Sequence, residues 1–304
     1  MVGEKQIKNK RNAFYKKGVI FCYIMLSLSI IHFIIFWLCV NISSIKIAFT
    51  VRDGTGIEKF SLANFELFFV DVANPNGTIF SAIKNTVLYF LMDMFKRVLA
   101  FVIAYFFYKK IWGSKTFRVI FYLPSLLSDL IIVTIFKKFI ATGGPLYNVL
   151  LELFNYELPV LLGSPETATG TILFYVLWSG FGATMLIFVG VMNRIPEDII
   201  EAARIDGCTW FKEFTKIVIP LAWETLYTML VLGMAGIVMA SGPIMVFTGG
   251  AFDTYTLSYW IFAQTKAGSY NYPAAIGLLT TVITIPITFI SRWLMSKFNS
   301  DITY

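Results

Sequence analysis

The sequence is poor in charged residues and in the residue types that build most catalytic and metal sites. Only 14% of its 304 residues are charged, whereas a soluble domain carries about a quarter. His32 is the single histidine, which excludes an HExxH zinc site and a histidine-based catalytic triad. The three cysteines are too few and too scattered for a disulfide framework or a metal cluster: Cys22, Cys39 and Cys208. We therefore expect no catalytic residues, no bound metal and no cofactor.

A nucleotide-binding loop is also missing. The stretch Gly113-Ser114-Lys115-Thr116 lacks the earlier glycine and the order that a phosphate-binding G-x-x-x-x-G-K-[S/T] loop requires. The net charge of +7 comes without an aromatic and basic motif for stacking bases, so no nucleic-acid partner is expected. We do not expect the chain to hydrolyse ATP or to be an enzyme.

Apolar residues are abundant, at 57% of the total, and they come in long runs. Runs of about 20 apolar residues cross a bilayer as helices, because lipid cannot satisfy exposed backbone polar groups. The pattern predicts an all-α integral membrane protein whose six transmembrane helices are 18–40, 85–108, 119–136, 167–193, 225–252 and 267–291. Pro124 is expected to bend the third helix, and Gly242-Pro243 is expected to interrupt the fifth.

The basic residues predict how the chain crosses the membrane. Six lie in residues 1–17, four in 109–118, four in 194–216, and Arg292 and Lys297 follow the last apolar run. Basic residues gather on the cytoplasmic side, so both termini and the loop around residue 200 are predicted to be cytoplasmic. The first apolar run has no small-residue cleavage site after it, which favours a retained anchor helix. Residues 43–81 are expected outside, with one small helix near 62–69.

Three charges fall near the middle of the predicted second helix. Asp93 lies three residues before Lys96 and four before Arg97, which places all three on one helix face. A lone charge there costs about 2.5–3.5 kcal/mol on insertion scales. We favour an internal ion pair that faces partner helices. The alternative is that these residues line a translocation path or contact a second subunit.

Residues 194–220 form the longest charged stretch in the second half of the chain. Pro196 suits the first position of a helix, and Gly207 suits a helix end that needs a positive φ. Apolar residues at helical spacing in 209–218 predict a second helix, which Pro220 is expected to end. The stretch is therefore predicted to be two short helices joined at a corner.

The same stretch carries a spaced motif: Glu201-Ala202-Ala203, then Gly207, Ile217 and Ile219-Pro220. It resembles the EAA loop of ABC importer permeases, which has a leucine where Ile219 stands. From about residue 60 onward the chain resembles the sugar-type, binding-protein-dependent members of that family. The further landmarks are Asn85-Thr86, Phe121 to Pro124, Trp178, Gly180-Phe181-Gly182, Ile195-Pro196, Thr248-Gly249-Gly250, Gly268 and Ala274-Ala275.

The resemblance implies a type I ABC importer permease in a bacterial plasma membrane. It implies a heterodimer with a second homologous permease, two ATPase subunits that bind the ATP, an extracellular or periplasmic solute-binding protein and a carbohydrate substrate. Residues 1–80 would hold the head, first helix and external loop, 81–296 a five-helix permease core, and 297–304 a cytoplasmic tail. The ATPase-coupling residues implied within 194–220 are Glu201, Ala202, Ala203, Asp206, Gly207, Ile217 and Pro220.

Three departures from the family pattern limit what the resemblance implies. Cys208 stands where an alanine is usual, and both residues are small enough for docking. The triplet Asp93, Lys96 and Arg97 and the segment Ser241-Gly242-Pro243 differ from the usual residues at places that could contact substrate or partner. The particular sugar is therefore not implied. The alternatives are an ABC permease for a non-sugar solute and a stand-alone secondary transporter or channel.

Overall fold

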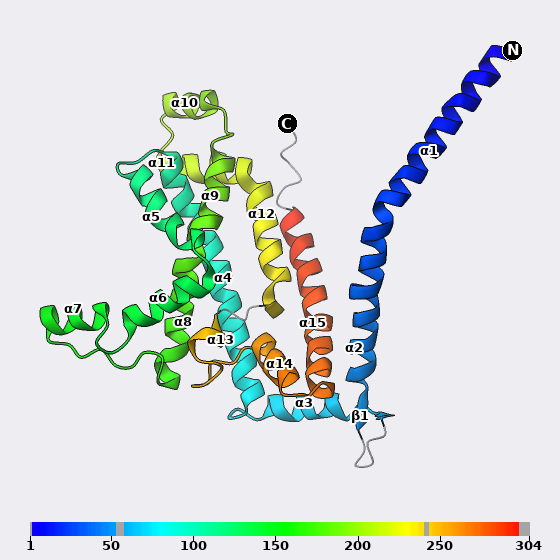
Figure 1. The fold of residues 1–304 in the computed structure, drawn as a ribbon. Helices are drawn as coiled ribbons and strands as arrows, with labels where there is room; N and C mark the ends of the chain where they lie inside the picture. The colour runs from blue at the N-terminus through cyan, green and yellow to red at the C-terminus, as the bar shows by residue number, and fades with distance from the viewer. Residues whose placement is uncertain (1, 53–57, 240–242, 298–304) are drawn as a thin grey trace. The chain divides into compact units, whose positions relative to one another are not determined.

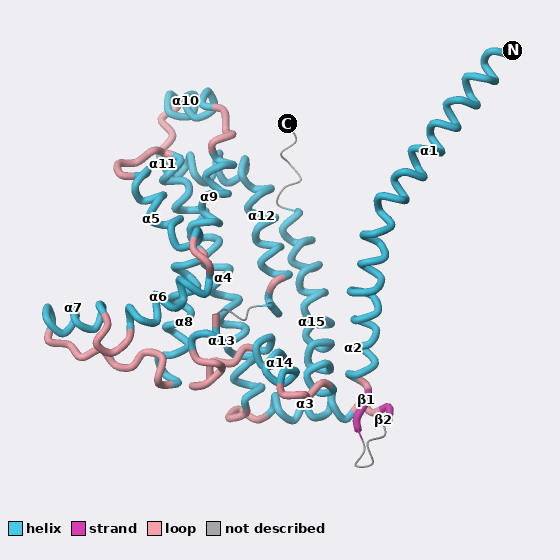
Figure 2. Tube along the Cα trace, in the orientation of Figure 1, coloured by secondary structure: helices cyan, strands magenta, loops and turns pink. Residues whose placement is uncertain are grey.

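The computed structural model describes residues 2–52, 58–239 and 243–297, with residues 2–17, 52 and 238 described as backbone only. Figures 1 and 2 show that the described chain is mostly helical. It divides into two compact units. The first consists of Met1–Phe65 with Tyr270–Ala275, and the second of Glu66–Ser269 with Ile276–Tyr304. The all-α expectation holds apart from one short strand pair.

The first unit is built on one continuous helical run. Helix α1 (Val2–Phe33) passes through a π-helical turn (Ile34–Cys39) into α2 (Val40–Ala48), so the run continues eight residues beyond its predicted end at 40. Strands β1 (Thr50–Arg52) and β2 (Glu58–Phe60) then form an antiparallel hairpin that the sequence did not predict. Strands of three residues are too short to show a periodic pattern.

Two asparagines hold the hairpin to the end of α2. Asn64 Nδ2 donates to the carbonyl oxygens of Ala48 and Thr50, both at 3.0 Å. Asn271 Nδ2 donates to the Thr50 carbonyl oxygen at 2.7 Å. Because these amides satisfy buried backbone acceptors, they fix where the chain turns after the long helix.

The second unit contains most of the helices, and the first residues of α3 and of α15 belong to the first unit (Figure 1). The small helix expected near 62–69 is α3 (Ala63–Ala73), and the turn after it leads into α4 (Thr78–Tyr108). The remaining helices are α5 (Ser114–Leu126), α6 (Asp129–Ile140), α7 (Pro145–Phe154), α8 (Pro165–Ser179), α9 (Phe181–Met192), α10 (Glu197–Ile205), α11 (Trp210–Glu213), α12 (Ile219–Ala235), α13 (Ile244–Phe247), α14 (Leu257–Lys266) and α15 (Asn271–Ser296). A π-helical turn joins α11 to α12, and a 3-10 turn (Ile237–Met239) follows α12.

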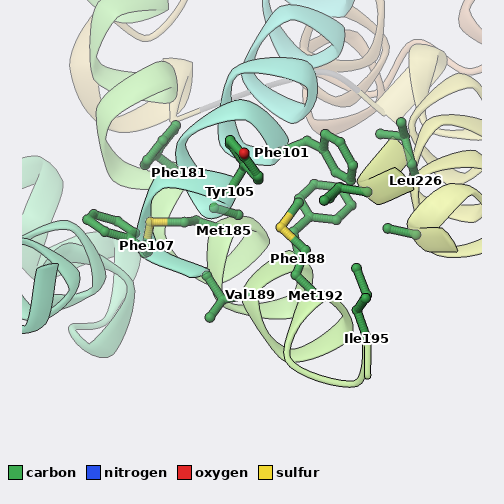
Figure 3. Close-up of a cluster of buried hydrophobic side chains, with 14 of the residues drawn as sticks. Phe101, Tyr105, Phe107, Phe181, Met185, Phe188, Val189, Met192, Ile195 and Leu226 are labelled. Carbon is green, nitrogen blue, oxygen red and sulfur yellow. The ribbon is translucent and has the colours of Figure 1, made fainter. Parts of the chain in front are cut away.

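The core of this unit forms where α4 packs against α9. Phe101 of α4 meets Phe188 of α9 edge to face, with ring centroids 5.1 Å apart (Figure 3). Met185 and Met192 are fully buried in the same cluster. Such aromatic pairs stabilise by about 0.5–1.5 kcal/mol beyond the area they bury. A second cluster surrounds Phe136 of α6 and Tyr175 of α8.

Five helical stretches among the described residues are long and apolar enough to cross a membrane: Gly18–Ala48, Asp129–Phe154, Pro165–Met192, Trp210–Ala235 and Asn271–Ser296. Helix α4 is 31 residues long, more than the ~20 that a bilayer needs, but it carries the three charges noted above. The chain is therefore a multi-pass helical membrane protein.

The third predicted helix is broken rather than bent. Helix α5 accepts Pro124 in its interior, and the break comes at Leu127, which is extended with φ −88° and ψ 153°. Ser128 then precedes α6, and Asp129 lies in its first turn, where the positive end of the helix dipole favours a carboxylate. Asp129 therefore marks the start of a new helix. The sequence did not reveal this start, because apolar residues surround Asp129 on both sides.

The fifth predicted helix ends earlier than expected. Helix α12 stops at Ala235, and Gly236 follows it. Of the interruption expected at Gly242-Pro243, Gly242 lies outside the described residues, as does Ser241 of the segment that departs from the family pattern, while Pro243 precedes α13. The turn expected at residues 248–250 is present, with φ +62° at Gly249 and +87° at Gly250.

Helix α14 was not predicted, and it is tied to α4 by two landmark residues. Asn85 Nδ2 donates to the carbonyl oxygens of Asp253 and Tyr255 at 2.5 and 2.9 Å. Thr86 Oγ1 accepts from the backbone N–H of Leu257 at 2.9 Å. The Asn-Thr pair therefore holds the backbone at the start of α14, which explains why these residue types suit the start of the span.

Gly182 lets two helices approach closely. A Cβ built at this position would overlap the Phe121 carbonyl oxygen and would lie 2.7 Å from the Cα of Tyr122. Both contacts are with the backbone of α5, which cannot swing aside as a side chain can. Gly190, on the same helix α9, has no atom within 4 Å of an added Cβ.

Alanine substitutions at these two glycines should have opposite effects on the stability of the purified full chain. Gly182→Ala should lower the thermal unfolding midpoint, because overpacking costs about 1–3 kcal/mol. Gly190→Ala should raise it slightly, since Ala is favoured over Gly in a helix by about 0.8–1 kcal/mol. Thermal unfolding in detergent measures both variants. Equal midpoints for the two would contradict a close backbone contact at Gly182.

Candidate functional site

Residues 194–220 form a projecting loop whose first part is α10, at one end of the second unit in Figure 1. Pro196 precedes the helix with extended ψ, and Glu197 and Asp198 occupy the first turn, where they complement the positive end of the dipole. Arg204 lies in the last turn. Ile200 is buried, whereas Ile199 and Ile205 are exposed, so only a narrow side of α10 packs on the protein.

The corner after α10 is a glycine-terminated helix end. Gly207 has φ +71°, as its position predicted. Its N–H donates to the Arg204 carbonyl oxygen at 3.0 Å, and the Cys208 N–H donates to the Ala203 carbonyl oxygen at 2.9 Å. This pair of bonds is the Schellman pattern, which satisfies carbonyls left free at the end of a helix. The corner is therefore a defined turn that depends on one residue with a positive φ.

The expectation that Pro220 ends the second helix is wrong. Thr209 caps α11, and the helical run then continues to Ala235 through a π-helical turn, Phe214–Val218. The Ile219 N–H bonds the Phe214 carbonyl oxygen, five residues back. A proline in a regular α-helix clashes with the carbonyl four residues earlier. The wider π turn just before Pro220 relieves that clash, so the loop helix and the following span are one rod.

Glu213 is the residue that fixes the loop, and sequence reasoning missed it. Its side chain is 3% exposed, and its two carboxylate oxygens each lie 2.8 Å from Lys109 Nζ. Tyr105 Oη lies 3.1 Å from Glu213 Oε1 and 3.1 Å from the Trp210 carbonyl oxygen. The ion pair joins α11 to the end of α4 across 104 residues of sequence. We refer to Tyr105, Lys109 and Glu213 as the loop anchor.

A signal for Glu213 did exist in the sequence. It lies three residues after Trp210 and four before Ile217, on the apolar side of the predicted helix. A carboxylate on an apolar face needs a buried partner. The neighbouring charges made the whole stretch read as exposed.

The predicted coupling residues divide into two groups. Glu201, Ala202, Asp206 and Gly207 are exposed, and Ala203 is half-buried. Ile217 and Pro220 are half-buried, and Ile217 packs on the core around Phe101 and Phe188. Beside Glu201 lies a cavity of about 250 Å³ between α10 and the end of α4, lined also by Lys109, Lys110 and Arg204. The outer group can contact another molecule, and the inner group holds the loop to the helices.

The three charges of α4 are brought together as their spacing predicts. Asp93 Oδ1 lies 2.8 Å from Lys96 Nζ, and Asp93 Oδ2 lies 2.7 Å from Arg97 Nε. Asp93 and Arg97 line a second cavity of about 230 Å³. Within the described part of the chain, no cluster of three or more His, Cys, Asp or Glu residues could hold a metal ion.

Membrane-length helices packed around an apolar core, with a projecting helical loop, define a polytopic membrane protein. The chain belongs to the family of binding-protein-dependent transport system inner membrane components, whose profile matches residues 97–304. Members of this family are the permease subunits of ABC transporters.

The similar proteins agree with this family. MsmF, the multiple sugar-binding transport system permease protein of Streptococcus mutans, is 28% identical over 205 residues, 66% of this chain and 70% of that protein. YesP, the probable ABC transporter permease protein of Bacillus subtilis, is 27% identical over 299 residues, 95% of each chain. A chain in the crystal structure of a bacterial alginate ABC transporter, in complex with an alginate pentasaccharide-bound periplasmic protein, has the same fold. Its TM-score is 0.81 at 20% identity, over 93% of this chain and 96% of that one.

The loop anchor gives a prediction on stability. Glu213→Gln removes the buried charge that Lys109 pairs with, and breaking a buried pair costs about 3–5 kcal/mol. We expect a large fall in the thermal unfolding midpoint of the purified chain. The exposed Glu152 of α7 is the matched control, and Glu152→Gln should change the midpoint little.

A charge swap separates pairing from packing. The double variant Glu213→Lys with Lys109→Glu should recover part of the stability that either single variant loses, because opposite charges face each other again. Additive losses in the double variant would contradict a stabilising ion pair.

Proposed function

We propose that this chain is one of two permease subunits of an ATP-driven importer for a carbohydrate. Family membership supports the importer, and the sugar-binding system of MsmF and the alginate transporter support a carbohydrate. The observation that carries the coupling role is the projecting loop. Its inner part is held to α4 by the loop anchor, while the exposed side of α10 presents Glu201, Ala202 and Asp206 to a partner.

In this proposal two separate ATPase subunits bind and hydrolyse ATP, so this chain needs no cofactor and no catalytic residue. Helix α10 docks in a cleft of one ATPase. Glu201 makes a polar contact there, and the small side chains of Ala202 and Ala203 allow close approach. Closure of the ATPase dimer moves α10, and the spans tilt as rigid bodies between inward-open and outward-open states. An external solute-binding protein delivers the solute, as the alginate-loaded periplasmic protein does for its transporter.

The same proposal gives the chain's arrangement in the membrane. Six spans cross it, formed by α1–α2, α4, α5–α6, α8–α9, α11–α12 and α15. Both termini and the 194–220 loop lie in the cytoplasm, since most basic residues are on that side. Residues 1–80 add a first span and an external segment to a permease core at 81–296, with a tail at 297–304. A bacterial plasma membrane and a second, homologous permease complete the assembly.

Gly207→Val tests the coupling role of the corner. The variant forces a β-branched residue to a positive φ, which costs about 1–2 kcal/mol. The docking of α10 on the ATPase should be weakened by this amount, so uptake and ATPase stimulation should each fall about tenfold. The assembled transporter in native membranes is assayed for both, with insertion checked by immunoblot.

Gly143 supplies the matched control for this variant. It has φ +74° and, like Gly207, no atom within 4 Å of an added Cβ, but it lies between α6 and α7. Gly143→Val should leave ATPase stimulation near normal. Normal uptake in Gly207→Val would count against coupling through this corner.

Cys208 tests the orientation. It is a free cysteine next to the corner, and it is partly exposed. In a variant with Cys22 and Cys39 changed to serine, a membrane-impermeant maleimide should label Cys208 in inside-out vesicles and not in intact cells. Labelling in intact cells would place the loop outside, where no ATPase could reach it.

A further inference from the structure

The cavity beside Asp93 and Arg97 lies halfway along the longest helix of the second unit. Asp93 is the central residue of α4 (Thr78–Tyr108), about 22 Å from either end at 1.5 Å per residue. The cavity holds about 230 Å³. This is below the ~300–1,000 Å³ of sites for drug-sized ligands, and it suits a single sugar ring.

Besides α4, the cavity is lined by the end of α12 and the turn that follows it. Gly233 in the last turn of α12, Gly236 just after it and Ile237 in the 3-10 turn all line the cavity. A Cβ at Gly233 would lie 2.7 Å from Arg97 Nε, so glycine leaves the room that the guanidinium occupies. Non-helical backbone within a membrane is tolerated where it lines a cavity, and transporters commonly bind solutes at such places.

The charges at the cavity do not balance. Asp93 pairs with both Lys96 and Arg97, which leaves one positive charge in excess. Arg97 uses Nε for Asp93, and within the described residues its two terminal nitrogens have no protein acceptor. A guanidinium presents its nitrogens in a planar fork that matches a carboxylate. The excess charge and the free nitrogens both favour an anion in the cavity.

Tyr89 adds a polar group that lacks a protein partner. Its side chain lines the same cavity and is 3% exposed, and no atom of the described structure bonds its hydroxyl. A buried polar group left without a partner costs about 1–3 kcal/mol. A sugar hydroxyl or ring oxygen in the cavity would satisfy it.

We propose that the transported solute is an acidic oligosaccharide and that this cavity binds one uronic acid ring of it, with the carboxylate of that ring paired to Arg97 and one of its hydroxyls bonded to Tyr89. The inference rests on the proposed function, because it assumes a carbohydrate permease. It goes further in naming uronic acid sugars as the class and in naming the two contacts.

The test measures binding to the intact transporter, purified from its native membrane through a tag on this chain and placed in nanodiscs. The solute-binding protein is left out, so that its own selectivity does not enter. The probes are oligomers of galacturonate, glucuronate and mannuronate, each compared with its carboxyl-reduced neutral counterpart. Calorimetric titration gives the ratio of the two affinities. At least one acidic oligomer should bind about tenfold more tightly than its neutral counterpart.

Four variants test the proposed contacts of the solute with Arg97 and Tyr89. Arg97→Gln removes the excess charge but can still bond Asp93, so the acidic preference should disappear, whereas Arg97→Lys should keep most of it. Tyr89→Phe should weaken the acidic and neutral oligomers alike, without loss of thermal stability, because its hydroxyl has no partner to lose. Lys84→Gln makes the same charge change at an exposed position of α4, and it should leave the ratio unchanged.

The outcomes separate the inference from the proposed function. Equal binding of acidic and neutral oligomers, or an acidic preference that survives Arg97→Gln, overturns the inference and leaves a carbohydrate permease standing. A transporter that takes up no carbohydrate, and instead takes up another solute with its ATPase, overturns both. An acidic preference that is lost in Arg97→Gln and kept in Lys84→Gln supports the inference.

Discussion

The arrangement of the second unit depends on one carboxylate that is buried among aromatic rings. Glu213 cannot leave Lys109 without placing a charge in an apolar cluster, and such a separation costs several kcal/mol. Helix α11 and the end of α4 are therefore one mechanical body. Helix α10 is held far more weakly, with Ile200 as its buried side chain and a glycine corner behind it. A force applied to α10 thus reaches the membrane helices through the corner and the loop anchor.

The second unit has two sets of ion pairs, one within α4 and one at its end. Lys109 follows its last residue, and Asp93 lies 16 positions earlier, about 24 Å along the axis. The helix between them is uninterrupted. One continuous helix therefore links the loop that would meet the ATPase to the cavity that would hold the solute. A tilt of α4 would displace Arg97 and Tyr89 relative to α12, and so change the cavity in which both lie.

Features with a local cause could be predicted from the sequence. Apolar length predicted most helices, Gly207 predicted its own positive φ, and the spacing of Asp93 to Arg97 predicted their ion pairs. Features that depend on distant partners could not. Glu213 is buried only because Lys109 is there, and α14 begins where Asn85 and Thr86 hold the chain. The prediction that Pro220 ends a helix was wrong because a π turn removes the clash that a proline normally causes there.

The π turn between α11 and α12 has a mechanical meaning of its own. The π turn contains one residue more than the α-helical turn it replaces, so its five residues rotate about the axis by roughly as much as four residues of an α-helix. If that surplus migrates one step along the rod, the segment it has passed turns by about 100° about the axis, while each amide simply exchanges one carbonyl for its neighbour. A helix with such a π turn can rotate about its axis in discrete steps without unfolding. Pro220, which follows the turn, limits how far the turn can move toward the C-terminus.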